Sequence, residues 1–174
     1  MTADTITAAD SRINARWLIP VEPFGVVLEH QAVILQGSRI ADVLPQSEAD
    51  QKYRTRETVN LDRHVVMPGL INLHSHTAMS LFRGLADDLP LMTWLNDHIW
   101  PAEGRFVSEP FVLDGTRLAM AEMLRTGTTT FSDMYFFPEV TALAAHDAGM
   151  RAQVCFPLMD MPTVWGSGPD EYLR

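Results

Sequence analysis

Two histidines stand two residues apart at the end of a short uncharged segment, and their types and spacing suit metal chemistry. The segment covers residues 67–73, and His74 and His76 follow it. Residues i and i+2 of a β-strand point to the same face, so both imidazoles would lie within reach of one ion. Because the segment has no charge, we expect its strand to be buried, and a metal best explains two buried imidazoles. From spacing alone, a structural role is an equally good interpretation.

The segments that follow predict alternating helices and strands. Ser108-Glu109-Pro110 is typical of a helix start, and the helix would run to about Thr126, with Gly127 as a left-handed stop. The order strand, helix, strand, helix, strand indicates parallel βαβ units. The later elements are a strand over residues 128–134, a helix over 139–149 and a strand over 151–158.

The first 66 residues differ, with short apolar runs separated by turn signals. Strands at this spacing are typical of a small sandwich or sheet. We expect two domains: residues 1–66, the N-terminal part of a small β-sandwich, and residues 67–174. Residues 1–11 are small and polar, and we expect them to be frayed. The predicted elements are strands over residues 15–19, 26–28, 32–35, 39–43 and 58–62, and a helix over 47–54.

The end of the chain predicts the first turn of another helix, over residues 170–174. A helix of one turn is too short to be stable, so we expect the chain to be truncated.

Charge and composition exclude several classes of protein. The chain has 174 residues, with 13 Lys+Arg against 22 Asp+Glu and a formal net charge of −9, which argues against binding nucleic acid. No uncharged apolar run approaches the roughly 20 residues that span a bilayer, so we expect no membrane association. The N-terminus lacks the basic and apolar regions of a secretory signal. With Cys155 as its single cysteine, the chain has no internal disulfide, so we expect a cytoplasmic protein.

One long stretch resembles a known family. Residues 65–103 read VVMPGLINLHSHTAMSLFRGLADDLPLMTWLNDHIWPAE. This stretch resembles the amidohydrolase superfamily, and within it the deaminases of S-adenosylhomocysteine, methylthioadenosine and adenosine. The PGLINLHSH core is shared by many members, whereas RGLADDLPLMTWLNDHIWPAE is more particular. The resemblance implies an α/β fold, a (β/α)8 TIM barrel whose first three strands lie in residues 67–174, preceded by the small β-sandwich.

The resemblance also implies a reaction and a site. Members bind one divalent metal, usually zinc, through histidines that match His74 and His76, with further ligands on later strands. A glutamate that matches Glu103 holds the ribose hydroxyls of a nucleoside. The reaction is hydrolytic deamination of adenine, which gives the inosine analogue and ammonia, and members are often homo-oligomers. Some members carry an arginine just after strand three, where this chain reads Cys155-Phe156-Pro157. That departure weakens the case for binding a homocysteine carboxylate.

Other candidate residues rest on position. Without the resemblance, Glu103 would be read as a solvated loop residue. Asp133 ends the second strand of the α/β unit, where barrel chemistry often lies, and we expect it in the pocket. Trp94 is expected to line an apolar wall for the substrate, as are Met92 and Trp100, although ordinary core is an equally good interpretation. The residues interpreted as structural, solvated or non-nucleophilic are His30, His64, His98, His146, the Asp87-Asp88 pair and Cys155.

The chemistry expected of residues 1–174 alone is limited. Two imidazoles leave a catalytic zinc short of its usual three or more protein ligands. We identify no catalytic acid or base in the segment and expect it to bind metal weakly without turnover. Two alternatives stay open: an amidohydrolase of another ring (guanine, 8-oxoguanine, cytosine or a triazine), and a non-catalytic binding module that keeps the histidine pair.

Overall fold

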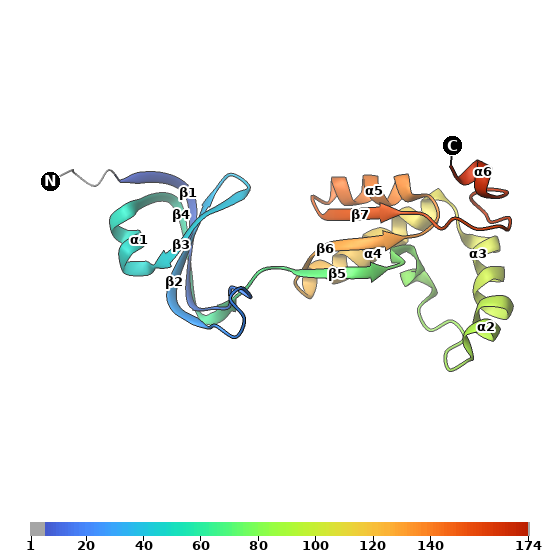
Figure 1. Cartoon of the computed structure of the whole chain (residues 1–174), viewed down its shortest axis with the longest axis horizontal. Coiled ribbons are helices and arrows are strands. Elements are labelled where there is room, and N and C mark those ends of the chain that lie inside the picture. Colours follow the sequence, from blue (N-terminus) through green and yellow to red (C-terminus); the bar gives the residue numbers. More distant parts are fainter. Residues whose placement is uncertain (1–5, 174) are drawn as a thin grey trace. The chain divides into compact units, whose positions relative to one another are not determined.

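The computed structural model describes residues 6–173, which form two compact units (Figure 1). The first unit ends at Pro68, and the second begins at Gly69. No helix in residues 6–173 is both long and apolar enough to cross a membrane.

The first unit is one four-stranded sheet with one helix. Its strand order is β3-β2-β1-β4, with β1 parallel to β4 and antiparallel to β2, and β2 antiparallel to β3. The second sheet of the expected sandwich is not among the described residues. The elements are β1 (Thr7–Leu18), β2 (Leu28–Gln36), β3 (Arg39–Pro45), α1 (Gln46–Lys52) and β4 (Tyr53–Val66).

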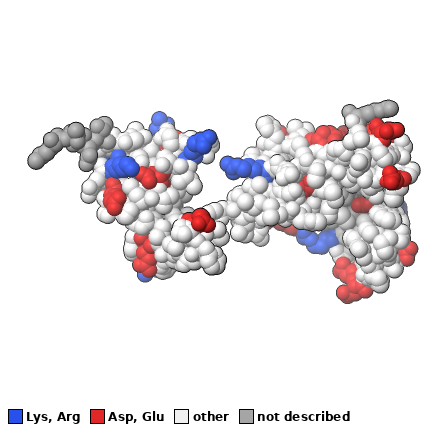
Figure 2. All heavy atoms as spheres, viewed as in Figure 1, with Lys and Arg blue, Asp and Glu red and all other residues white. Residues whose placement is uncertain are grey.

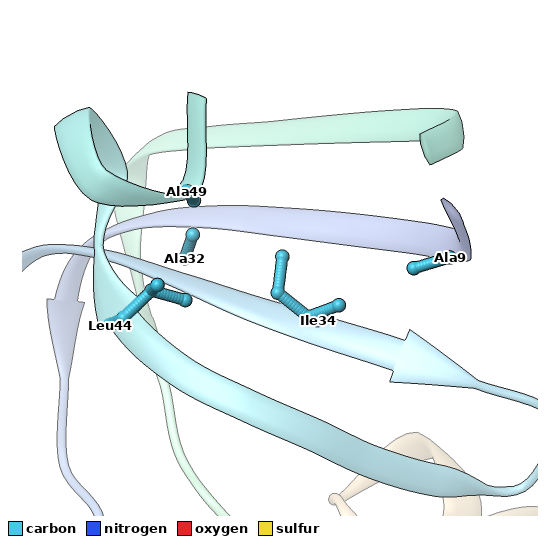
Figure 3. Close-up of a cluster of buried hydrophobic side chains, with 5 residues drawn as sticks. All are labelled: Ala9, Ala32, Ile34, Leu44 and Ala49. Carbon is cyan, nitrogen blue, oxygen red and sulfur yellow. The ribbon is translucent and has the colours of Figure 1, made fainter. Parts of the chain in front are cut away.

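Small and branched side chains close the core of this unit between α1 and the sheet. Ala49 reaches from α1 toward Ala32, Ile34 and Leu44 of β2 and β3, and Ala9 of β1 completes the cluster (Figure 3). All five are at least nine-tenths buried. Because β1 already pairs with β4 at Thr7, the expectation of a frayed segment is wrong for residues 7–11. Residues 1–5 of that expectation lie outside the described residues.

The second unit contains a parallel sheet of order β5-β6-β7, as the βαβ pattern predicts. Both predicted helices form, and they pack side by side against one face of the sheet, where Met120 and Ala144 enclose Phe131 (Figure 1). The elements are β5 (Leu70–Ser75), α4 (Glu109–Arg125), β6 (Thr128–Met134), α5 (Pro138–Asp147) and β7 (Arg151–Cys155).

The predicted helix ends are confirmed in atomic detail. The Ser108 hydroxyl accepts a hydrogen bond from the Phe111 amide at 3.5 Å and caps α4. Gly127 and Gly149 follow α4 and α5 with φ of 87° and 66°, which a residue with a Cβ atom adopts only with strain. β7 ends at Cys155 rather than at residue 158, because Pro157 has no amide proton for a sheet hydrogen bond.

Between β5 and α4 the chain folds into short helices that stand beyond the carboxyl ends of the strands (Figure 1). A tight 3₁₀ helix begins at the residue after His76. After a turn over residues 83–90, three helical segments follow one another without a break. A further short helix, α6, forms where the sequence predicts one. These elements are η1 (Thr77–Phe82), α2 (Leu91–Trp94), the π-helical η2 (Leu95–Ile99), α3 (Trp100–Phe106) and α6 (Pro169–Tyr172).

The expected burial of the histidine strand is wrong for the described part of the chain. Leu70, Ile71 and Leu73 are 49%, 63% and 80% exposed. β5 is an edge strand that pairs only with β6, so nothing in residues 6–173 covers its other edge. An uncharged sequence therefore indicates a strand that is suited to burial. It does not show that other parts of the described chain cover that strand.

Candidate functional site

His74 and His76 lie close enough to share one ion. Their ring centres are 5.1 Å apart, and the ring planes are inclined at 81°. With Zn–N distances of 2.0–2.1 Å and tetrahedral angles, two imidazole centres on one zinc would lie about 5 Å apart. The side chains therefore fit a shared zinc ion. His74 is exposed and His76 is half-buried, because β5 is an edge strand in the described chain.

The backbone at the end of β6 orients the ring of His76. Its Nδ1 atom lies 2.7 Å from the Met134 carbonyl oxygen. A carbonyl can only accept, so Nδ1 donates to it, and Nε2 is the ring nitrogen that remains for another partner. Metal-binding histidines are typically held in this way through their second nitrogen. The contact thus leaves Nε2 as the nitrogen of His76 that could bind a metal ion.

Asp133 supports the turn that carries His76. Its carboxylate accepts the Thr77 amide at 2.6 Å and lies 3.3 Å from the Ser75 hydroxyl. The residue is 2% exposed, and burial raises the pKa of the Asp133 carboxyl, while the bonds from Thr77 and Ser75 oppose that rise. Asp133 does not line the cavity described below. Its contacts make it a positioning group for the end of β5.

Within the described residues, the histidine pair has no third metal-binding side chain beside it. No group of three or more His, Cys, Asp or Glu side chains suited to one metal ion occurs within residues 6–173. Catalytic zinc sites normally have at least three protein ligands. The pair alone would therefore leave a catalytic zinc short of ligands.

A cavity of about 630 Å³ opens beside His76. Short helices form one wall, and the segment after β7 forms another. The lining is mostly apolar, and Glu103 is its one carboxylate among the described residues. The lining residues are His76, Met79, Leu91, Trp94, Leu95, Ile99, Trp100, Glu103, Gly104, Met134, Tyr135, Phe136, Pro157, Met159, Met161, Pro162, Thr163 and Val164.

Glu103 is a buried residue of α3, so the interpretation as a solvated loop residue, which its sequence context alone favoured, is wrong. It is 8% exposed, and its Oε1 accepts a hydrogen bond from the Tyr135 hydroxyl at 2.8 Å. Burial raises the pKa of the Glu103 carboxyl, against the smaller opposing effects of Tyr135 and of His76. A buried carboxylate on a cavity wall can hold hydroxyl groups of a ligand.

The tryptophans expected near a substrate do lie at the cavity. Trp94 and Trp100 both line it, and the Trp94 indole N–H donates to the Leu85 carbonyl at 3.1 Å. Met92 is 56% exposed and does not contribute to the wall. The turn of the helix therefore directs Trp94 to the cavity wall and Met92 to the surface.

Sequence reasoning missed Tyr135 and the segment after β7. Tyr135 follows the last residue of β6, so the rule that barrel chemistry gathers at the carboxyl ends of strands could have found it. Asp160 is the one charged residue in the segment over residues 157–164, and no signal in the sequence marks this segment as a cavity wall.

The remaining candidates lie away from the cavity. The Asp87-Asp88 pair sits in an exposed turn, and Cys155 donates to the Asp133 carbonyl at 3.2 Å. Four histidines also lie outside the lining: His30, His64, His98 and His146.

A comparison with protein families decides which group this fold belongs to. The model of the amidohydrolase family matches residues 65–173, which include β5 and the whole cavity. The chain belongs to the amidohydrolase family. The resemblance carried by residues 65–103 is thereby confirmed.

Relatives in this family are deaminases of nucleosides by name. A 5-methylthioadenosine/S-adenosylhomocysteine deaminase of Saccharophagus degradans is 59% identical over 168 residues, which are 97% of this chain and 38% of the relative. A 5'-deoxyadenosine deaminase of Methanosarcina barkeri is 40% identical over 154 residues, 88% of this chain and 34% of the relative. The chain thus spans little more than a third of the length of these relatives.

A solved structure supports the same placement. An adenosine deaminase from Xanthomonas campestris with bound zinc matches with a TM-score of 0.94 and 45% identity, over 97% of this chain and 38% of that chain. The match includes both units of the described residues.

Proposed function

We propose that the intact protein containing this chain is a metal-dependent hydrolytic deaminase of adenine nucleosides. Water replaces the C6 amino group, which leaves as ammonia, and the product is the inosine analogue. The observation that carries this proposal is that one cavity is lined by both His76 and the buried Glu103. The relatives named as deaminases support the same reaction.

The histidine pair is proposed to hold the metal. We assign His74 and His76 as two ligands, with zinc as the metal, and the remaining ligands to residues outside this chain. Zinc bound in such a site supplies a nucleophile at neutral pH by lowering the pKa of a bound water. His76 contributes through Nε2, because the Met134 carbonyl holds its other nitrogen. Asp133 contributes by fixing the Thr77 amide and with it the turn after β5.

Glu103 and the apolar wall are proposed to bind the nucleoside. The Glu103 carboxylate accepts hydrogen bonds from the ribose hydroxyls, and Trp94 packs against the apolar part of the substrate. Among the described lining residues there is no lysine or arginine. A zwitterionic 5′ substituent would therefore lose its hydration without a cationic partner. This composition favours 5′-methylthioadenosine or 5′-deoxyadenosine over S-adenosylhomocysteine.

The wider assignments follow from the same family. We propose that β5, β6 and β7 are the first three strands of a (β/α)8 barrel, and that residues 1–66 belong to a small β-sandwich. The location is proposed as the cytoplasm, where the single Cys155 suits reducing conditions. The partner is a small-molecule nucleoside, and homo-oligomers are expected. On the face shown in Figure 2, the Lys and Arg side chains of each unit do not gather into a basic patch. This distribution fits a protein that binds no nucleic acid.

A substrate panel tests the proposal. The intact protein is loaded with zinc, and ammonia release is measured with 5′-methylthioadenosine, 5′-deoxyadenosine, adenosine and S-adenosylhomocysteine, and with guanine, 8-oxoguanine, cytosine and a triazine. We expect the highest kcat/KM for 5′-methylthioadenosine and 5′-deoxyadenosine, whose 5′ groups are apolar, and the lowest among the four nucleosides for S-adenosylhomocysteine. Turnover confined to the last four compounds would replace the proposal with another amidohydrolase activity, and no turnover of any compound would favour a binding module.

A further inference from the structure

One buried hydrogen bond joins two elements at the cavity. The Tyr135 hydroxyl donates to Oε1 of Glu103 at 2.8 Å, across 32 positions of sequence. Tyr135 is 5% exposed and Glu103 is 8% exposed, so water competes little for either group. The bond links α3 to the end of β6, and both residues line the cavity.

The bond leaves one carboxylate oxygen of Glu103 for a ligand. Within residues 6–173, Oε1 has Tyr135 as its donor and no side chain or amide donates to Oε2. Burial raises the pKa of the Tyr135 hydroxyl, and the neighbouring Glu103 carboxylate adds to that rise. The phenol therefore stays protonated and acts as a donor. A carboxylate fixed through one oxygen has a defined direction for the other.

We propose that Tyr135 is a positioning residue that holds Glu103 in the orientation in which its free oxygen accepts the ribose hydroxyls. This inference rests on the proposed nucleoside deaminase function. In this role Tyr135 affects the binding of the sugar and does not affect the reaction at the adenine ring.

Paired substrates test the inference on the intact, zinc-loaded protein. Tyr135→Phe keeps the ring and removes only the hydroxyl, and kcat and KM are measured for adenosine and for 2′,3′-dideoxyadenosine. Loss of one hydrogen bond to a charged group should lower kcat/KM for adenosine by about 10- to 100-fold, mainly through KM. For the dideoxynucleoside the variant should match the wild type, because that substrate has no hydroxyl for Glu103 to bind.

A double variant excludes a merely structural role. If Tyr135 acts through Glu103, then Tyr135→Phe combined with Glu103→Gln lowers kcat/KM for adenosine no further than Glu103→Gln does alone. Tyr53→Phe is the matched control, since it removes a phenol hydroxyl that donates to Asp42 at 2.9 Å in the first unit. We expect this variant to have the same kcat and KM as the wild type for both substrates.

Four outcomes would overturn the inference. An equal loss with both nucleosides would make Tyr135 a structural residue, and additive losses in the double variant would separate it from Glu103. If the wild type deaminates adenosine and the Tyr135→Phe variant has the same kcat/KM, this inference alone is overturned. A wild type that releases no ammonia from either nucleoside would overturn the proposed function as well.

Discussion

Each unit contains a tyrosine hydroxyl that donates to a carboxylate, and the two carboxylates lie in opposite electrostatic settings. In the first unit, Asp42 accepts a tyrosine hydroxyl at 2.9 Å and also pairs with Lys52 at 2.6 Å, which lowers the pKa of the Asp42 carboxyl. In the second unit, Glu103 accepts the Tyr135 hydroxyl at 2.8 Å, and no lysine or arginine in residues 6–173 pairs with it. Burial then raises the pKa of the Glu103 carboxyl.

This difference separates structural charges from charges available to a ligand. The carboxylate of Asp42 is satisfied within its own unit and borders no described cavity. The buried carboxylate of Glu103 opens onto a cavity whose described lining residues include no lysine or arginine. Such an arrangement costs stability and is typical of functional sites. The comparison favours the second unit as the location of the proposed site.

The largest effect is expected from the histidine strand. In the intact protein, His76→Ala removes a proposed ligand and should lower kcat/KM for 5′-methylthioadenosine by on the order of 100-fold or more, since even groups that only support ligands cost 10- to 100-fold. Ammonia release measures the change. His146→Ala, on the exposed side of α5, is the control and should retain wild-type activity. Equal activity in both variants would remove His76 from the site.

A glycine in α4 tests how tightly the turn after His76 is packed. A Cβ atom at Gly115 would lie 2.5 Å from the Ala78 carbonyl oxygen and 2.8 Å from its Cα. Gly115→Ala should therefore lower the free energy of unfolding by about 1–3 kcal/mol, as overpacking does. Gly104→Ala in α3 meets nothing within 4 Å and should be neutral or stabilising. Denaturant unfolding of the intact protein measures both, and a neutral Gly115→Ala would show that α4 can move.

How far the sequence predicts this molecule depends on whether a signal is local. Ser108, Gly127 and Gly149 mark helix ends through their own backbone needs, and the predicted ends of α4 and α5 agree with the structure. The histidine pair was likewise evident from a strand period of two. These features need no knowledge of distant residues.

The failures concern contacts made at long range. Glu103 follows Trp-Pro-Ala, which resembles a loop, and its hydrogen-bond donor Tyr135 is 32 residues away. The apolar residues of β5 were expected to be buried, yet Leu73 is 80% exposed, because burial requires a neighbouring element that local sequence cannot specify. Position on a strand placed Asp133 correctly at the end of β6 but could not show that its carboxylate faces the Thr77 amide.

The pH dependence of stability should distinguish Glu103 from an ordinary surface acid. A carboxyl whose pKa is raised in the folded state destabilises the protein as the pH rises above its unfolded pKa, about 4.3 for Glu. Glu103→Gln should therefore raise the melting temperature of the intact protein relative to the wild type, and by more at pH 7 than at pH 4. A difference that is constant over this range would mean that the Glu103 pKa is not raised.

The smallest effect is expected at Asp42, with the opposite sign. A lowered pKa contributes stability above the unfolded pKa of Asp, about 3.9, and this stability is lost as the pH falls through the folded value. Lys52→Met should lower the melting temperature slightly at pH 7, and the difference should shrink at lower pH and in high salt, because Lys52 is exposed. A deficit that grows toward pH 3 would contradict the assignment of the lowered pKa to Lys52.

The most direct test is zinc-edge X-ray absorption of the intact protein loaded with one equivalent of zinc. The spectrum of the wild type is compared with that of a variant that carries both His74→Ala and His76→Ala. We predict imidazole nitrogens at about 2.0–2.1 Å in the wild type, with scattering from two imidazoles lost in the variant. Identical spectra, with zinc still bound, would show that these rings do not share the ion.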